Sequence, residues 1–110
     1  EFTPSAYNDP ALAKRVTDTM ADWLGRGTLI KRQPTMGGED FGMYGRTEHK
    51  IPIFMFALGT VSSDLIKRFR AAGKPLPMVH SSTYAPDIEP SLRTGVTATT
   101  ATALDLFAAP

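Results

Sequence analysis

Apolar residues recur at helical spacing in the first quarter of the chain. Asn8-Asp9-Pro10 precedes them, and such a run marks a helix start because a short polar side chain accepts hydrogen bonds from free backbone N–H groups and proline needs no N–H partner there. Gly25 and Gly27 mark the end. The spacing predicts an amphipathic helix to about Leu24. Its apolar stripe consists of Leu12, Val16, Met20, Trp23 and Leu24.

The middle of the chain alternates between strand and helix patterns. Thr28 to Gln33 predicts a short strand closed by Pro34, and the glycine turn after it leads into a short helix to about Tyr44. Ile51 to Leu58 is apolar on both alternating faces, which is typical of a central strand covered on both sides. Pro52 must then lie at the start of that strand.

Two helices are predicted in the last part of the chain. Ser63 to Ala72 forms an amphipathic pattern that stops at Gly73-Lys74-Pro75, and a longer pattern runs from about Pro90 to Ala108. The inward residues are predicted to be Leu65, Ile66 and Phe69 in the first helix, and Leu92, Val96, Thr99, Ala103, Leu106 and Phe107 in the second.

Together these elements predict an α/β fold. Two or three strands are too few to form a sheet that two helical layers would cover, so the rest of the sheet is expected to come from elsewhere. The residues before Asn8 are predicted to form an extended segment, broken by Pro4, through which the chain enters from a strand of a preceding unit.

Composition narrows the function classes. The chain has 110 residues with 12 Lys and Arg against 11 Asp and Glu, a net charge of +1, which gives little support to a nucleic-acid or membrane partner. It has no cysteine, so this chain holds no disulfide, redox pair or cysteine-ligated metal, and the compartment stays undecided. The longest apolar run, Ile51 to Leu58, is far below the ~20 residues that span a bilayer.

Few residues are candidates for chemistry. His80 follows a proline-rich turn, and a histidine in such a loop is either a structural or exposed residue or a metal ligand. His49, between Glu48 and Lys50, is predicted to be a surface residue. The chain contains no HxH or HExxH spacing, so it encodes no complete metal site.

A glycine turn is the second candidate. Gly37 and Gly38 allow a sharp bend close to a ligand, and the helix start after Glu39 and Asp40 offers free N–H groups to an anionic substrate group. The alternative is a plain turn in which Asp40 caps the helix.

Taken in order, these segments resemble a known family. The series begins with Met36-Gly37-Gly38-Glu39-Asp40-Phe41 and continues with the apolar strand that ends at Gly59. Val79-His80-Ser81 comes next, and Gly95-Val96 opens the final helix. The series resembles the C-terminal part of the zinc aminoacylase and carboxypeptidase family, metallopeptidase family twenty, in its hippurate hydrolase and indole-acetyl-amino-acid hydrolase branch. The resemblance covers nearly the whole chain.

The resemblance implies a metal site shared with another part of the protein. His80 corresponds to the family's last metal ligand, the only one that the C-terminal segment supplies. Gly37, Gly38, Glu39 and Asp40 correspond to a loop that lines the cleft, next to the substrate or the metal ligands. Two divalent ions, zinc or manganese, are implied in the complete enzyme. The general base and other ligands belong to the N-terminal half, so no catalytic residue is expected in this segment.

The resemblance also implies a domain organisation. Residues 1–8 are expected to end a strand of the preceding lid or dimerisation domain, and residues 9–110 to form the C-terminal segment of a mixed-sheet, zinc-peptidase-like catalytic domain with helices on both faces. The complete enzyme is expected to hydrolyse N-acyl-amino acids or small peptides as a homodimer, and this segment to be inactive without the N-terminal half. The alternative is a free-standing, non-catalytic binding or interaction domain derived from that family.

Overall fold

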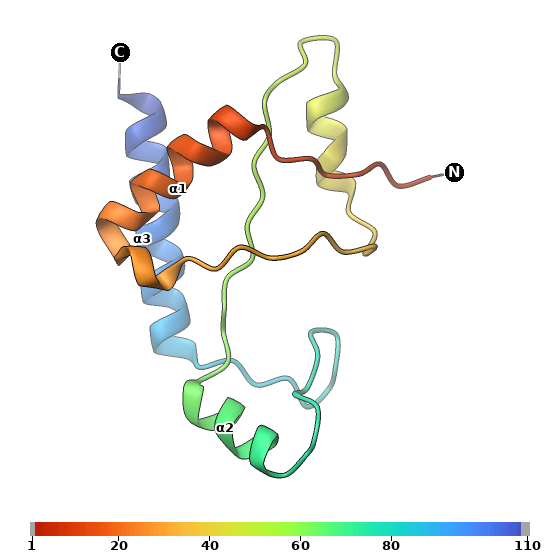
Figure 1. The fold of residues 1–110 in the computed structure, drawn as a ribbon. Coiled ribbons are helices and arrows are strands. Elements are labelled where there is room, and N and C mark those ends of the chain that lie inside the picture. The colour runs from red at the N-terminus through yellow and green to blue at the C-terminus, as the bar shows by residue number, and fades with distance from the viewer. Residues whose placement is uncertain (1, 109–110) are drawn as a thin grey trace. The chain divides into compact units, whose positions relative to one another are not determined.

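The computed structural model describes residues 2–108, so Glu1 and residues 109–110, which the predicted domain ranges include, lie outside the described residues. The chain divides into two compact units. Unit 1 comprises residues 2–57 and 97–108 of the described chain, and unit 2 comprises Leu58–Val96. In chain order, Figure 1 shows α1 (Pro10–Leu24), η1 (Arg26–Thr28), η2 (Asp40–Arg46), α2 (Ser63–Ala71) and α3 (Ile88–Phe107).

Helix α1 confirms the first predicted helix, including the residues at which it begins and ends. Asp9 is the N-cap, and its Oδ1 accepts a hydrogen bond from the backbone N–H of Leu12 at 2.8 Å. Pro10 takes the first helical position, where its missing N–H costs nothing. Gly25 follows the helix with φ +89°, a value that glycine adopts without the steric penalty of a Cβ.

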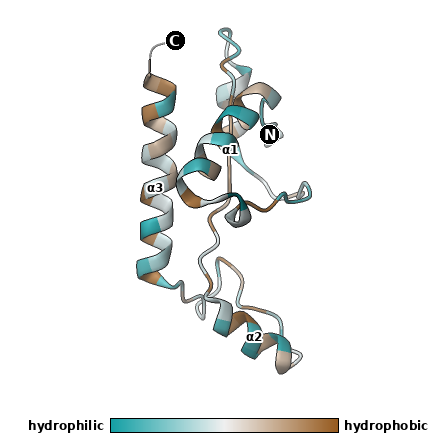
Figure 2. Ribbon diagram, turned by 60° about the vertical axis from the view of Figure 1, so that its left-hand side comes forward, coloured by the Kyte–Doolittle hydropathy of each residue, from teal (hydrophilic) through white to brown (hydrophobic). Residues whose placement is uncertain are grey.

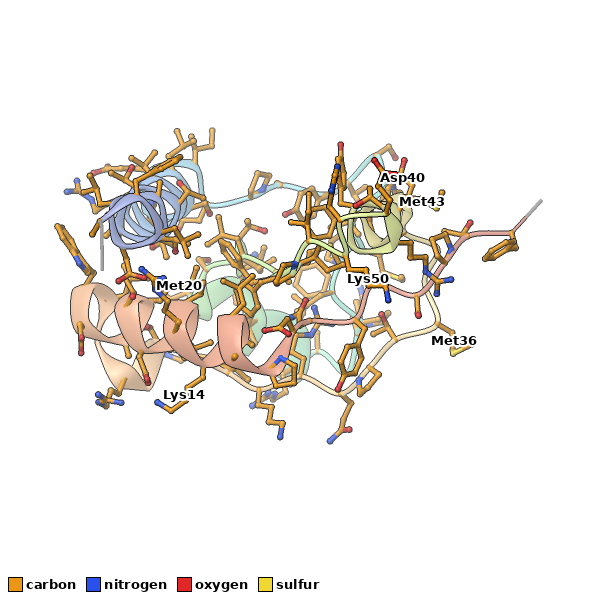
Figure 3. All side chains as sticks on the ribbon, turned by 90° about the horizontal axis from the view of Figure 1, so that it is seen from above. Lys14, Met20, Met36, Asp40, Met43 and Lys50 are labelled. Atoms are coloured by element: carbon orange, nitrogen blue, oxygen red, sulfur yellow. The ribbon has the colours of Figure 1, made fainter. Side chains whose placement is uncertain are left out.

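The core of unit 1 forms where α1 meets the C-terminal half of α3. Val16 and Met20 are 1% and 3% exposed, and Ala98 of α3 is 2% exposed. Figure 3 shows Met20 between the two helices. Arg15 donates from Nε to Asp105 Oδ2 at 2.6 Å and from Nη2 to the Asp105 carbonyl, so charge-assisted hydrogen bonds also join α1 to α3. Leu12, Leu24, Leu29 and Phe54 pack around this cluster.

The predicted inward face of the last helix is wrong, although the helix itself is present. All six residues predicted to be inward are exposed, including Leu92 at 63% and Phe107 at 89%. The buried residues of α3 are instead Ala98 and Ala101. Ala98 packs with Val16 and Met20 of α1, and its small side chain leaves room for the bulky Met20.

Residues 51–57 form an extended segment of unit 1, and within residues 2–108 no strand pairs with it. The carbonyl of Ile53 accepts a hydrogen bond from Asp9 N at 2.9 Å, and the side chain of Asn8 pairs with the backbone of Met55. Ile53 is the buried residue of this segment, and it lies against Gly45 of η2. The segment is thus held by the residues just before α1.

Unit 2 is built around α2 and the loop that precedes α3. Ser62 caps α2 by accepting from Leu65 N at 3.3 Å. Figure 2 shows alternating polar and apolar residues along α2, and its predicted inward residues Leu65, Ile66 and Phe69 are partly buried. The carbonyl of Thr60 accepts from Asp87 N at 2.7 Å, and the Thr60 hydroxyl is hydrogen-bonded to that of Tyr84.

The predicted α/β fold, with its mixed sheet and helices on both faces, is wrong for the described chain. Residues 2–108 contain helices and extended segments but no strand. Residues 51–58 are extended yet form no ladder, and the predicted strand at 28–33 begins inside η1. A strand exists only when a neighbour accepts its hydrogen bonds, and local hydrophobic periodicity cannot show whether that neighbour is present.

No helix within residues 2–108 is both long and apolar enough to cross a membrane.

Candidate functional site

His80 lies in an exposed turn of unit 2. Its φ is +70°, in the left-handed region that histidine visits more often than most residues. The turn is closed by a hydrogen bond from Ser81 N to the Met78 carbonyl at 3.1 Å. The imidazole is exposed and has no hydrogen-bond or ionic partner among residues 2–108. Both ring nitrogens are therefore open to a ligand that approaches from outside the described chain.

The loop after His80 is held by its own hydroxyl groups. The Ser81 hydroxyl is hydrogen-bonded to the Thr83 hydroxyl at 2.8 Å and accepts from Thr83 N at 3.2 Å. Tyr84 N donates to the Ser81 carbonyl at 3.1 Å. Glu89, an acid near this loop, pairs with Arg93 at 2.8 Å within α3. The loop is thus held by hydrogen bonds of its own, and His80 lies in its first turn.

The glycine turn at residues 37–40 lies in unit 1, whereas His80 lies in unit 2. Gly37 and Gly38 are exposed, and neither has a positive φ, so the structure does not use the conformational freedom that the sequence suggests. Glu39, not Asp40, caps η2, because its Oε1 accepts from Phe41 N at 3.0 Å. The predicted Asp40 cap is therefore wrong, and Asp40 is the first residue of η2. Figure 3 shows Asp40 on η2 near Met43.

The described chain holds no complete metal site. Within residues 2–108, no three His, Cys, Asp or Glu residues come together in a group that could hold an ion. His49 is exposed and pairs with its neighbour Glu48 at 3.3 Å, which confirms that it is a surface residue. His80 could thus offer one donor, and any further ligands would have to come from outside the described chain.

A cavity in unit 1 escapes the sequence analysis. It has a volume of about 270 Å³ and lies among the N-terminal segment, η2 and residues 50–53. Two cationic residues, Arg46 and Lys50, line it together with Tyr7. Its residues are far apart in the sequence and match no motif, so only the fold brings them together. A sequence signal would have been the turn 47–50, which separates the two cations.

No protein-family model, curated protein or solved structure matches the chain. The family resemblance therefore depends on the residues of this chain alone, above all on the runs 36–41 and 79–81.

Proposed function

We propose that the chain is the C-terminal segment of a metal-dependent amidohydrolase or peptidase that cleaves N-acyl-amino acids or small peptides. His80 supplies one metal ligand in this proposal. The order of the runs 36–41, 56–59, 79–81 and 95–96 is what connects the chain to this chemistry. The observation that carries the proposal is the exposed His80 imidazole, which lacks a partner within residues 2–108.

His80 suits a ligand position for chemical reasons. Neutral imidazole is a good ligand for zinc, and its second ring nitrogen can be fixed when its N–H donates a hydrogen bond to a neighbouring acceptor. A pair of zinc or manganese ions, when bound, lowers the pKa of a water and polarises the scissile carbonyl. This chain's contribution is to hold one imidazole on an ordered loop. The turn at Gly37, Gly38, Glu39 and Asp40 would lie beside the substrate or the metal ligands.

The surface of the chain supports a partner that covers it. The accessible surface is 9169 Å². Folded monomers of this mass expose ~5,900 Å², and even two separate bodies of the two units' sizes would together expose only ~7,100 Å². Large apolar side chains form part of the excess, including Trp23, Tyr44 and Ile88, each more than half exposed. The N-terminal half of the same protein is the partner that we propose, within a homodimer.

The proposal is tested with the product of the source gene, expressed with all coding sequence that precedes Glu1. It should hydrolyse N-acetyl- or N-benzoyl-amino acids in a reaction that chelation stops and zinc or manganese restores. His80→Ala should lower the rate at least ~10-fold, because losing a ligand costs no less than losing the group that orients one. His49→Ala is the matched control and should retain activity. Equal activity of the two variants would overturn the role of His80.

The isolated chain gives a second test. A single histidine binds zinc weakly, so calorimetric titration of the 110-residue chain should detect no tight site. Submicromolar zinc affinity that disappears in His80→Ala would show that the chain forms a complete site by itself. That result would contradict a ligand set shared with an N-terminal half.

A non-catalytic binding domain is the second candidate, and the same exposed apolar side chains favour it. The two functions differ in what precedes Glu1. A start codon just upstream supports the binding domain, whereas an upstream HxD or CxH pair with a Glu-Glu pair supports the amidohydrolase.

A further inference from the structure

We propose that the cavity of unit 1 binds a small carboxylate with a short apolar tail. The cavity is distinct from His80, which belongs to unit 2, so this inference does not depend on the proposed function. It is bounded by the N-terminal segment, by η2 and by residues 50–53. Figure 3 shows Lys50 beside η2 and the N-terminal segment.

The charges at the cavity favour an anion. Arg46 and Lys50 are among the residues that line it, and neither side chain pairs with an acidic group among residues 2–108. The one carboxylate in the lining, that of Asp9, already accepts a hydrogen bond from Leu12 N as the cap of α1. The phenol of Tyr7 is exposed and has no partner within the described chain, so it can donate to a bound anion.

The backbone brings the two cations to the same cavity at a cost. Lys50 has φ +45°, which is uncommon for a residue with a Cβ. A hydrogen bond from Lys50 N to the Thr47 carbonyl at 2.9 Å closes this turn. Such backbone strain is often found where a side chain must be placed for binding. Here the turn returns the chain so that both Arg46 and Lys50 line the cavity.

The wall that η2 contributes to the cavity is closely packed at Gly42 and Gly45. A Cβ added to Gly42 would lie 2.6 Å from the Ser5 carbonyl oxygen, and one added to Gly45 would lie 3.2 Å from Ile53 Cδ1. Helix η2 therefore approaches both neighbouring segments as closely as glycine allows. A preformed site loses less conformational entropy when it binds.

Size and polarity select the kind of anion. The volume of about 270 Å³ is slightly below the ~300 Å³ at which drug-sized pockets begin. The lining also has an apolar part, which contrasts with the two cations and consists of Ile51, Pro52 and Ile53. A carboxylate of a few carbons satisfies both parts, because its head pairs with the Arg46 guanidinium and its tail covers apolar surface. Inorganic phosphate would satisfy only the cations.

The experiment is a titration of the intact chain followed by amide proton–nitrogen correlation spectra, with butyrate, butyramide and inorganic phosphate as the probes. Butyrate should bind in the millimolar range and shift the amides of Gly42, Gly45 and Lys50. Butyramide has nearly the same shape without the charge and should bind at least about threefold more weakly. Added salt should weaken the binding of butyrate but not the binding of butyramide.

Substitutions locate the effect. Arg46→Gln and Lys50→Gln should each weaken the binding of butyrate about two- to fivefold. The control is Lys31→Gln, which removes an exposed cation of unit 1 outside the cavity lining and should leave the affinity for butyrate unchanged. Because all three side chains are exposed, the variants should keep the native spectrum. Butyramide binding as tightly as butyrate, phosphate binding more tightly, or an equal loss in Lys31→Gln would each overturn the proposal.

Discussion

The side-chain amide of Asn8 makes two hydrogen bonds to the backbone of Met55, much as a neighbouring strand would. Asn8 Nδ2 donates to the Met55 carbonyl at 2.8 Å, and Met55 N donates to Asn8 Oδ1 at 2.8 Å. One residue on, Asp9 N donates to the Ile53 carbonyl at 2.9 Å. The extended segment is therefore fixed to the start of α1 by one amide side chain and one backbone bond.

Removing that amide should loosen the segment. Asn8→Ala loses both bonds to Met55, and we expect it to lower the free energy of unfolding by ~1 kcal/mol, because each exposed hydrogen bond contributes little net stability. Hydrogen exchange at the Met55 amide should become faster. Asn8→Asp is the matched control, since it keeps an acceptor for Met55 N and should preserve more of the protection. Unchanged exchange in Asn8→Ala would show that other contacts hold the segment.

The start of α1 shows what local sequence can predict. Asp9 and Pro10 act at the helix terminus through bonds that span at most three residues, so their pattern alone was sufficient. The predicted strand at residues 51–58 depends on hydrogen-bond partners elsewhere, and in the described chain its hydrogen bonds are those to Asn8 and Asp9. A run that is apolar on both alternating faces is compatible with a central strand, but it does not show that neighbouring strands are present.

Helix α3 and the cavity show that local sequence also fails to predict which residues pack together. The helix bounds are close to the prediction, yet the small residues Ala98 and Ala101 are buried while the larger Leu92 and Phe107 are exposed. Which face is covered depends on a partner, not on the helix itself. Likewise, Arg46 and Lys50 could be identified as a site only after folding had placed them with Tyr7.

The methionines provide a direct test of the core. Met20 is 3% exposed between α1 and α3, whereas Met36 is fully exposed, as Figure 3 shows. Met20→Ala should lower the free energy of unfolding by ~2–3 kcal/mol, because it removes buried methylene groups and leaves a cavity. Met36→Ala changes the same atoms on the surface and should have almost no effect. Urea unfolding measures both, and equal values would contradict this description of the core.

Gly42 should tolerate no side chain. Its added Cβ would lie 2.6 Å from the oxygen and 2.9 Å from the carbon of the Ser5 carbonyl, and backbone atoms cannot rotate away. We expect Gly42→Ala to cost ~1–3 kcal/mol through overpacking, despite the better helix propensity of alanine. The control is Gly27→Ala in η1, where nothing lies within 4 Å of the new Cβ. Thermal melts should separate the two variants, and similar melting temperatures would mean that residues 5 and 42 move apart freely.

A surface ion pair on α1 predicts a local pH dependence. Lys14 Nζ lies 2.6 Å from Asp18 Oδ2, and this hydrogen bond, followed by the Lys14 charge, holds the pKa of Asp18 below its ordinary value of 3.8. Because the folded-state pKa is the lower one, the pair stabilises the fold above the unfolded-state pKa, and the contribution is lost as the pH falls through the folded-state pKa. Lys14→Gln should raise the pKa of Asp18 toward 3.8, which a carboxyl-carbon NMR titration measures directly. Lys31→Gln removes a cation that has no partner among residues 2–108 and should leave the titration unchanged. If Asp18 titrates identically in Lys14→Gln and in the native chain, the pair is not formed in solution.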